Sequence, residues 1–137
     1  MFEHCVYFNT NILARQLNAE WEKSFESYDL SPSHAYLLLI VLKSPGLCQQ
    51  ELTEKMSLNK STITRFIMSL EKKGLLIRKD KSIDQREKLI FPSNKSIAIH
   101  NELAKICDDL YSTMCEVVGK EQLESFVNVA RKINENL

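Results

Sequence analysis

The sequence predicts a mainly α-helical chain that contains one small β-hairpin. Only three glycines and three prolines occur in 137 residues, which favours helices with short connections over a sandwich or barrel rich in turns. Six segments have the apolar patterning of helices, and one pair of short β-prone runs lies between the fourth and the fifth. The length suits one ordinary domain, and an apolar fraction of 44% suits a globular core.

The first two helices are expected from about Glu3 to Phe25 and from Ser31 to the turn at residues 44–46. Apolar residues recur at helical spacing in the first helix, namely Cys5, Phe8, Ile12, Leu13, Leu17, Trp21 and Phe25. In the second, Ser31 is a good N-cap and Pro32 a good first helical residue. The continuous apolar run over residues 36–42 predicts that this helix is buried on all sides.

Two short helices follow, over LCQQELTEKMS and LNKSTITRFIMSLEKKG. Leu47 is expected to face inward in the first, and in the second Asn59 is a cap and Gly74 closes the helix. The runs LLIRK and EKLIF flank the polar segment DKSIDQR, which predicts the hairpin. Two amphipathic helices end the chain. Their apolar stripes are Ile99, Leu103, Ile106, Leu110, Met114 and Val117 in one and Leu123, Phe126, Ala130 and Ile133 in the other.

Basic charge is concentrated in the middle of the chain. The formal net charge is zero, but residues 59–88 contain nine Lys or Arg and four Asp or Glu, a net charge of +5. Residues 1–58 sum to −3 and residues 89–137 to −2. This distribution, which the neutral total hides, favours a polyanionic partner for the central segment.

The helix that follows Asn59 has a polar face suited to a DNA groove. On a helical wheel at 100° per residue, most of its apolar residues and most of its polar residues fall on opposite faces, with Thr62 between them. The core face holds Ile63, Phe66, Ile67 and Leu70, and the other holds Ser61, Thr64, Arg65, Met68 and Lys72. An Arg there can pair with a guanine edge, and hydroxyls reach phosphates or bases. An ordinary solvated face explains the pattern equally well.

The hairpin concentrates basic side chains on one short ribbon: Arg78, Lys79, Lys81, Arg86 and Lys88. An Arg at the ribbon tip can enter a minor groove while Lys residues neutralise phosphates, and Asp84 is expected to hold Arg86 and the loop in shape. For the hairpin alone, a solvated charged loop is the favoured alternative. The order helix–helix–helix–hairpin and the local charge together predict a winged helix-turn-helix over residues 31–93.

Residues 1–30 and 94–137 are expected to form a helical dimerisation region. The winged core is too small to bury the apolar faces of all three amphipathic helices in these segments. The simplest way to bury them is to pack them against the same helices of a second copy. The alternative is a monomer whose terminal helices fold over its own core.

Residues 31–93 resemble the multiple-antibiotic-resistance-regulator (MarR) family of bacterial transcription factors. LNKSTITRFIMSLEKKGLLIRK is similar to the family's recognition helix and first wing strand, and DQREK to its wing motif, an Asp and an Arg separated by one residue. The resemblance implies an intertwined homodimer on a pseudo-palindromic DNA operator. It also implies groove and phosphate contacts from the recognition helix, phosphate contacts from Gln49 and Gln50, and a minor-groove role for Arg86. Cys48 departs from the family, which often has a capping Ser or Thr there.

The candidate DNA-binding residues follow from the helical wheel, the ribbon and the resemblance. They are Gln49, Gln50, Asn59, Lys60, Ser61, Thr62, Thr64, Arg65, Arg78, Lys81, Asp84, Arg86 and Lys88.

Two regulatory sites are implied by the resemblance, because some members of the family bind aromatic acids and others sense oxidants. Trp21, Phe25, Tyr28 and Tyr36 are candidates for an effector pocket, with an aromatic core as the favoured alternative. Cys5 is a redox candidate, with a buried interface residue as the favoured alternative, since the tyrosines of the peroxide-sensing members are replaced by Asn9 and Asn18.

Several function classes are disfavoured. The glycines are isolated, and neither a nucleophile elbow nor a metal-ligand pair is present, so an enzyme, a cofactor and a metal are not expected. No apolar run approaches the roughly 18 residues of a membrane span, and no secretory signal precedes the four cysteines, so a cytoplasmic protein is expected. The expected function is a dimeric DNA-binding regulator, a repressor released by a small ligand or an oxidant. The alternative is a winged helix used only for protein–protein contact.

Overall fold

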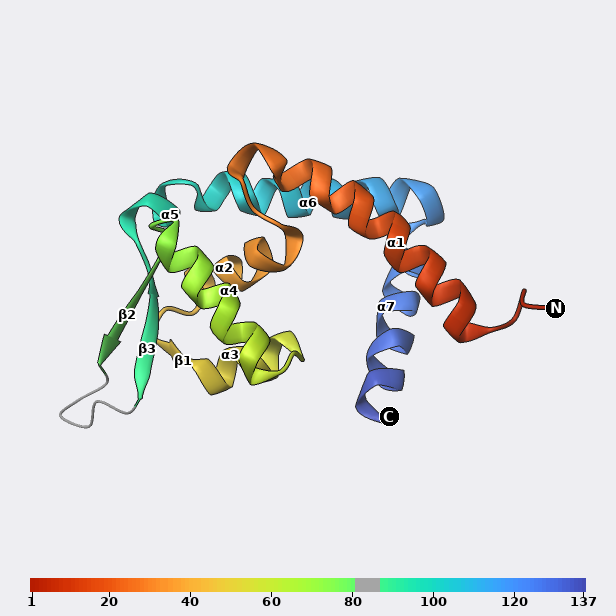
Figure 1. Cartoon of the computed structure of the whole chain (residues 1–137). Helices are drawn as coiled ribbons and strands as arrows, with labels where there is room; N and C mark the ends of the chain where they lie inside the picture. Colours follow the sequence, from red (N-terminus) through yellow and green to blue (C-terminus); the bar gives the residue numbers. More distant parts are fainter. Residues whose placement is uncertain (81–86) are drawn as a thin grey trace. The chain divides into compact units, whose positions relative to one another are not determined.

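A computed structural model describes residues 1–80 and 87–137 of the chain (Figure 1). It divides into two compact units, Met1–Leu103 and Ala104–Leu137. The first unit contains α1 (Val6–Phe25), the 3₁₀ turn η1 (Glu26–Tyr28), α2 (Pro32–Lys43), β1 (Leu47–Cys48), α3 (Gln49–Met56), α4 (Lys60–Lys72), β2 (Leu76–Asp80), β3 (Lys88–Pro92) and α5 (Asn94–Ala98). The helix α6 (His100–Val118) runs from the first unit into the second, which also holds α7 (Lys120–Glu135). The predicted mainly helical fold with a small hairpin is confirmed.

The helix starts follow from their capping residues. The hydroxyl oxygen of Ser31 accepts a hydrogen bond from the backbone N–H of His34 at 3.2 Å, and Pro32 is the first residue of α2, as its fixed φ favours. The side-chain oxygen of Asn59 accepts from the backbone N–H of Thr62 at 2.8 Å at the start of α4. Gly74, at φ +76°, turns the chain from α4 into β2, a conformation that side chains with a Cβ rarely adopt.

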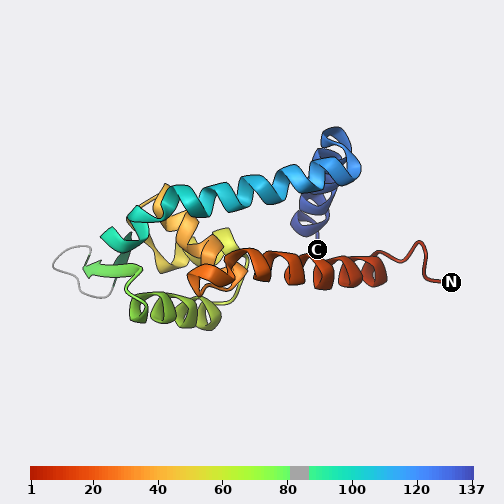
Figure 2. The same ribbon diagram turned by 90° about the horizontal axis from the view of Figure 1, so that it is seen from above.

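The sheet has three antiparallel strands in the order β1-β3-β2, although only the β2–β3 hairpin was predicted. Leu47, expected to face inward from a helix, instead lies in β1 opposite Ile90. Two residues give too short a run for a sequence pattern to identify as a strand, which explains the error. Figure 1 shows β2 and β3 side by side, and in Figure 2 α1 extends away from the other helices of the first unit.

The core of the first unit lies between α2, α3, α4 and the sheet. Its fully buried apolar side chains include Phe25, Leu37, Leu38, Val41, Leu52, Ile63, Ile67, Leu70, Ile90 and Leu103. The prediction that residues 36–42 are buried on every side is wrong for Tyr36, which is 38% exposed, and for Leu39 and Ile40, which are half-buried. The hydroxyl of Tyr36 accepts a hydrogen bond from the indole N–H of Trp21 at 3.1 Å.

The second unit leaves many apolar side chains uncovered. No residue of α7 is buried. Phe126, Val129 and Ile133 are 52%, 56% and 40% exposed and recur at helical spacing on one face of α7.

His34 gives the first unit a predicted acid sensitivity. Its ring packs edge-on against Phe66 of α4 with 4.5 Å between centroids, and burial, assisted by the nearby charge of Lys73, lowers the pKa of His34 below its ordinary value of about 6.5. The unfolded chain therefore binds a proton at His34 more readily than the folded chain does. The stability that neutral His34 contributes to folding is complete above about pH 6.5. It is lost as the pH falls from there through the lowered pKa.

The prediction is tested by urea unfolding of the wild type and His34→Gln at several values between about pH 7.5 and 5. Below about pH 6.5 the free energy of unfolding of the wild type should fall relative to that of His34→Gln. A constant difference across this range would show that His34 does not titrate against folding.

Candidate nucleic-acid interface

The two faces of α4 separate as the helical wheel predicts. Ile63, Ile67 and Leu70 are fully buried. The opposite face is exposed and holds Ser61, Arg65, Met68 and Lys72, with Lys60 exposed in the first turn. Thr64, predicted on the exposed face, is half-buried, and Phe66 is half-buried against His34.

A chain of hydrogen bonds orders the exposed side of α4 at its N-terminal end. The side-chain oxygen of Asn59 accepts from the hydroxyl of Ser61 at 2.9 Å as well as from the backbone N–H of Thr62. Arg65 donates from its guanidinium to the hydroxyl oxygen of Thr62 at 3.2 Å. Among the described residues this is the one hydrogen bond of Arg65, so most of its five guanidinium donors remain available. The arrangement restricts the arginine before any ligand arrives.

Gln49 links α3 to α4. Its amide nitrogen donates to the hydroxyl oxygen of Thr64 at 2.6 Å and, more weakly, to the carbonyl oxygen of Lys60 at 3.4 Å. The Thr64 hydroxyl in turn donates to the same carbonyl at 2.9 Å. Gln49 and Thr64, both predicted to contact DNA, are therefore joined to each other in the free protein. Gln50 remains exposed and bonds only weakly, at 3.5 Å, to Glu54.

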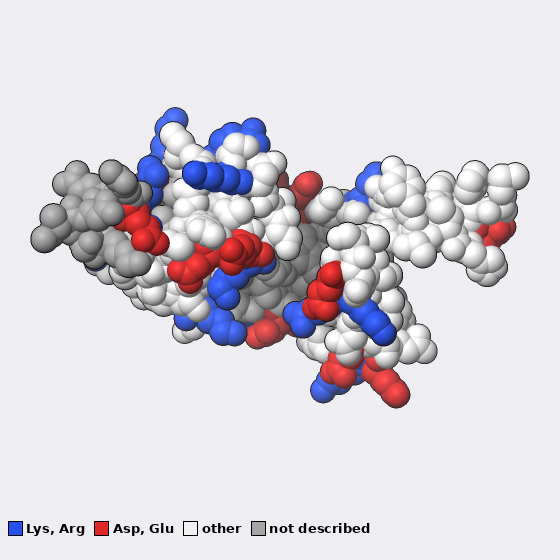
Figure 3. All heavy atoms as spheres, turned by 90° about the horizontal axis from the view of Figure 1, so that it is seen from below, with Lys and Arg blue, Asp and Glu red and all other residues white. Residues whose placement is uncertain are grey.

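Basic side chains of the strands have partners that the sequence did not reveal. Arg78 on β2 forms an ion pair with Glu71 of α4, with 2.9 Å between a guanidinium nitrogen and a carboxylate oxygen, and Lys88 on β3 pairs with Asp80 on β2. The ammonium group of Lys79 lies 4.8 Å from the centre of the Phe91 ring. On the face drawn in Figure 3, acidic side chains lie beside basic ones.

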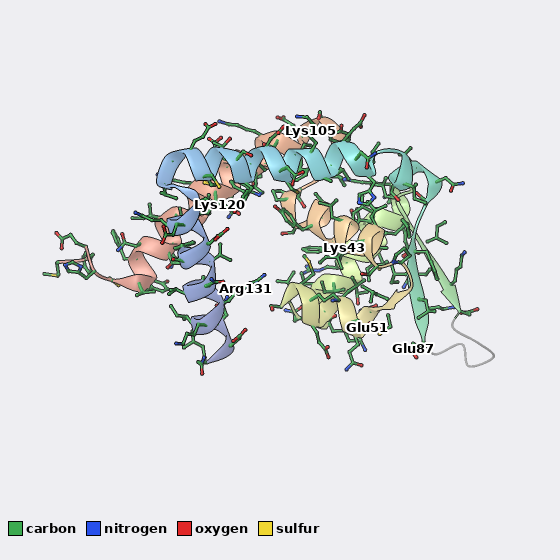
Figure 4. The ribbon with its side chains drawn as sticks, turned by 180° about the vertical axis from the view of Figure 1, so that it is seen from behind. Lys43, Glu51, Glu87, Lys105, Lys120 and Arg131 are labelled. Atoms are coloured by element: carbon green, nitrogen blue, oxygen red, sulfur yellow. The ribbon has the colours of Figure 1, made fainter. Side chains whose placement is uncertain are left out.

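A hollow of about 500 Å³ lies between α3, the start of α4 and the strands. It is lined by Cys48, Gln49, Gln50, Thr53, Lys60, Arg78, Glu87, Lys88 and Ile90. Figure 4 labels Glu87, which lines the hollow just before β3, and Glu51 on α3, an element that borders it. The hollow thus brings together five of the predicted DNA-binding residues. Lys81, Asp84 and Arg86 lie outside the described residues.

The start of α3 compensates for the missing hydroxyl cap. The carboxylate of Glu51, three residues into the helix, accepts from the backbone N–H of Cys48 at 3.4 Å and from its thiol at 3.1 Å. Burial raises the pKa of the Cys48 thiol, and the adjacent carboxylate raises it further. This cysteine is therefore held as the neutral thiol, the less reactive form.

Three of the four aromatic candidates for an effector pocket lie together. Phe25 is fully buried and packs edge-on against Tyr36, with 6.2 Å between ring centroids, and Tyr36 bonds to Trp21 as described. Tyr28 is engaged separately and donates its hydroxyl proton to a carboxylate oxygen of Glu102 at 2.8 Å. That bond raises the pKa of Tyr28.

Cys5 lies at the N-cap of α1 and is half-exposed. Its sulfur accepts from the backbone N–H of Phe8 at 3.5 Å. In residues 1–80 and 87–137, no group of three His, Cys, Asp or Glu side chains is placed to hold a metal ion. Across the same ranges no helix combines the length and hydropathy that crossing a bilayer requires.

Known proteins similar in sequence to this chain include two regulators of Bacillus subtilis. The "Uncharacterized HTH-type transcriptional regulator YybA" of Bacillus subtilis is 23% identical over 92% of this chain and 84% of its own length, and MhqR, an HTH-type transcriptional regulator of the same organism, is 24% identical over 89% and 84%.

Solved structures match the fold closely. The Staphylococcus aureus MepR–DNA complex superposes with a TM-score of 0.87 at 17% identity, over 98% of this chain and all of that one. A putative MarR-family regulator of Listeria monocytogenes, complexed with 26mer DNA, gives a TM-score of 0.83 at 21% identity, over 96% and 87%. The MarR family model matches residues 30–88, the segment that holds α2, β1, α3, α4 and β2 and ends at the first residue of β3. The resemblance predicted from the sequence is confirmed: residues 30–88 match the MarR family model, and the fold is similar to that of a solved MarR-family regulator.

Proposed function

We propose that the protein is a transcriptional regulator that binds duplex DNA in the major groove through α4 and contacts the flanking phosphates through the wing. The observation that carries the proposal is the exposed face of α4, where Ser61, Arg65 and Lys72 stand clear of the core while Arg65 is ordered by Thr62. Relatives crystallised with DNA share this fold. A preordered arginine loses less conformational freedom when it pairs with a guanine edge.

The acting form is a homodimer whose dimerisation region is residues 1–30 and 94–137. The exposed apolar side chains of α7, and Val6, Tyr7 and Phe8 at the start of α1, are the surfaces that a second copy covers. Two copies of α4 then read a pseudo-palindromic operator with half-sites about 34–36 Å apart. The protein acts as a repressor that a small aromatic ligand or an oxidant releases, by favouring a dimer with misspaced recognition helices. Trp21 and Tyr36 are the proposed ligand contacts and Cys5 the proposed oxidant target.

The test is selection of bound duplexes from random DNA, followed by affinity measurements at several salt concentrations. The selected duplex should contain two related half-sites, and its affinity should fall steeply between about 50 and 200 mM salt, because bound lysines and arginines release counterions. Lys105→Ala in α6 is a suitable control, since this exposed lysine is paired with Asp109 and should leave the salt dependence unchanged. Failure to enrich any duplex would favour the alternative, a winged helix that contacts only protein.

Repeating the measurement with salicylate-like acids and with peroxide tests the release mechanism. Affinity that neither compound changes would remove that part of the proposal and leave DNA binding intact.

A further inference from the structure

One large apolar side chain lies in the middle of the exposed, basic face of α4. Met68 is 55% exposed, although the apolar residues on either side of it along the helix, Ile67 and Leu70, are fully buried. At 100° per residue Ser61, Arg65, Met68 and Lys72 fall within an arc of about 60°. The thioether is therefore surrounded by the very groups proposed to face DNA.

The chemistry of the major groove offers one matching partner for this side chain. Among the groups that base edges present there, the 5-methyl of thymine is the apolar one. A basic face brings the helix to the polyanion, but Met68 itself can gain only from covering apolar surface. The unbranched side chain of methionine adapts to the position of a small apolar group.

The position of Met68 relative to Arg65 fits this partner. The two are three residues apart, so they are separated by about 4.5 Å along the helix axis. Successive base pairs are about 3.4 Å apart. A helix lying in the groove with Arg65 on one base pair therefore presents Met68 to a neighbouring step.

We infer that Met68 contacts the 5-methyl group of a thymine in each operator half-site and thereby makes the protein selective for T at that position. This inference rests on the proposed DNA-binding function and adds a specificity-determining residue to it. Removing one methyl group from a buried apolar contact should weaken binding about fourfold per half-site.

The experiment uses the duplex selected from random DNA, with each thymine replaced in turn by deoxyuridine, which removes only the methyl group. Wild type should bind about fourfold more weakly when one specific thymine is replaced, and roughly 15-fold more weakly when both half-sites are changed. Met68→Ala should bind the methylated and unmethylated duplexes equally, because the two changes remove the same contact. Met68→Leu, which keeps an apolar side chain, should retain most of the methyl dependence.

Lys72→Ala is the matched control on the same face, because it removes a charge and not an apolar group. The Lys72→Ala variant should bind every duplex more weakly. Replacing the specific thymine should reduce the affinity of this variant by the same factor as in wild type. A wild type indifferent to all the deoxyuridine replacements, or a Met68→Ala variant as sensitive as wild type, would overturn the assignment while leaving DNA binding in place. Failure of the wild type to bind any duplex would overturn the proposed function together with it.

Discussion

Replacing Ile67 by Ala is expected to lower the free energy of unfolding by about 2–5 kcal/mol. Ile67 is fully buried on the inner face of α4, beside Ile63 and Leu70. The truncation removes apolar area from the core and leaves a cavity that the surrounding helices fill only in part. The loss is measured by urea unfolding at a fixed protein concentration, because dimerisation makes apparent stability depend on concentration.

The neighbouring residue supplies the control. Met68→Ala changes a side chain of similar size one position along the same helix, but that side chain is 55% exposed. Its effect should stay within about 0.5 kcal/mol. Equal losses at the two positions would contradict the orientation of α4, and with it the face assigned to DNA.

The helices of the winged region could be predicted because their signals are local. Ser31 and Asn59 cap helices within three residues of their own position, and the 3.6-residue period of α4 assigns its buried face without any tertiary information. The strand β1 and the five-residue helix α5 were missed, since neither is long enough to develop a period.

The partners within the site could not be predicted, because they are tertiary. Arg78 and Glu71 lie on opposite sides of the turn at Gly74, a separation that no helical pairing rule covers. Gln49 and Thr64 are fifteen residues apart and meet only because α3 and α4 pack together. A sequence pattern identifies which side chains carry charge or a hydroxyl group, and the fold then decides which of them are already engaged.

The predicted DNA contacts differ in whether their side chains are already engaged within the protein. Before it contacts phosphate, Arg78 must share or exchange a half-buried partner, since Glu71 is 26% exposed and the Arg78 side chain 36%. Within residues 1–80 and 87–137, Arg65 has no acidic partner, and its hydrogen bond is to the neutral hydroxyl of Thr62. Arg65 is therefore the basic residue from which the largest effect on recognition is expected.

Replacing Arg65 by Ala is expected to reduce the preference for the selected duplex over random DNA by about 1–3 kcal/mol, or roughly 5- to 150-fold. The reason is geometric, since a guanidinium held by Thr62 can offer two parallel donors to the acceptor pair of a guanine edge. Arg65→Lys separates that effect from charge, because it keeps the charge but loses the paired donors. It should lose most of the preference while its salt dependence stays close to that of wild type.

Lys72→Ala supplies the opposite comparison on the same exposed face. If Lys72 contacts phosphate, its loss weakens binding to both duplexes about equally and reduces the salt slope by about one. An Arg65→Ala variant that behaves in the same way, with its preference intact, would show that Arg65 contacts the backbone. Base reading by α4 would then depend on its other exposed side chains. The contact of Met68 with a thymine methyl group would be the main remaining source of sequence preference.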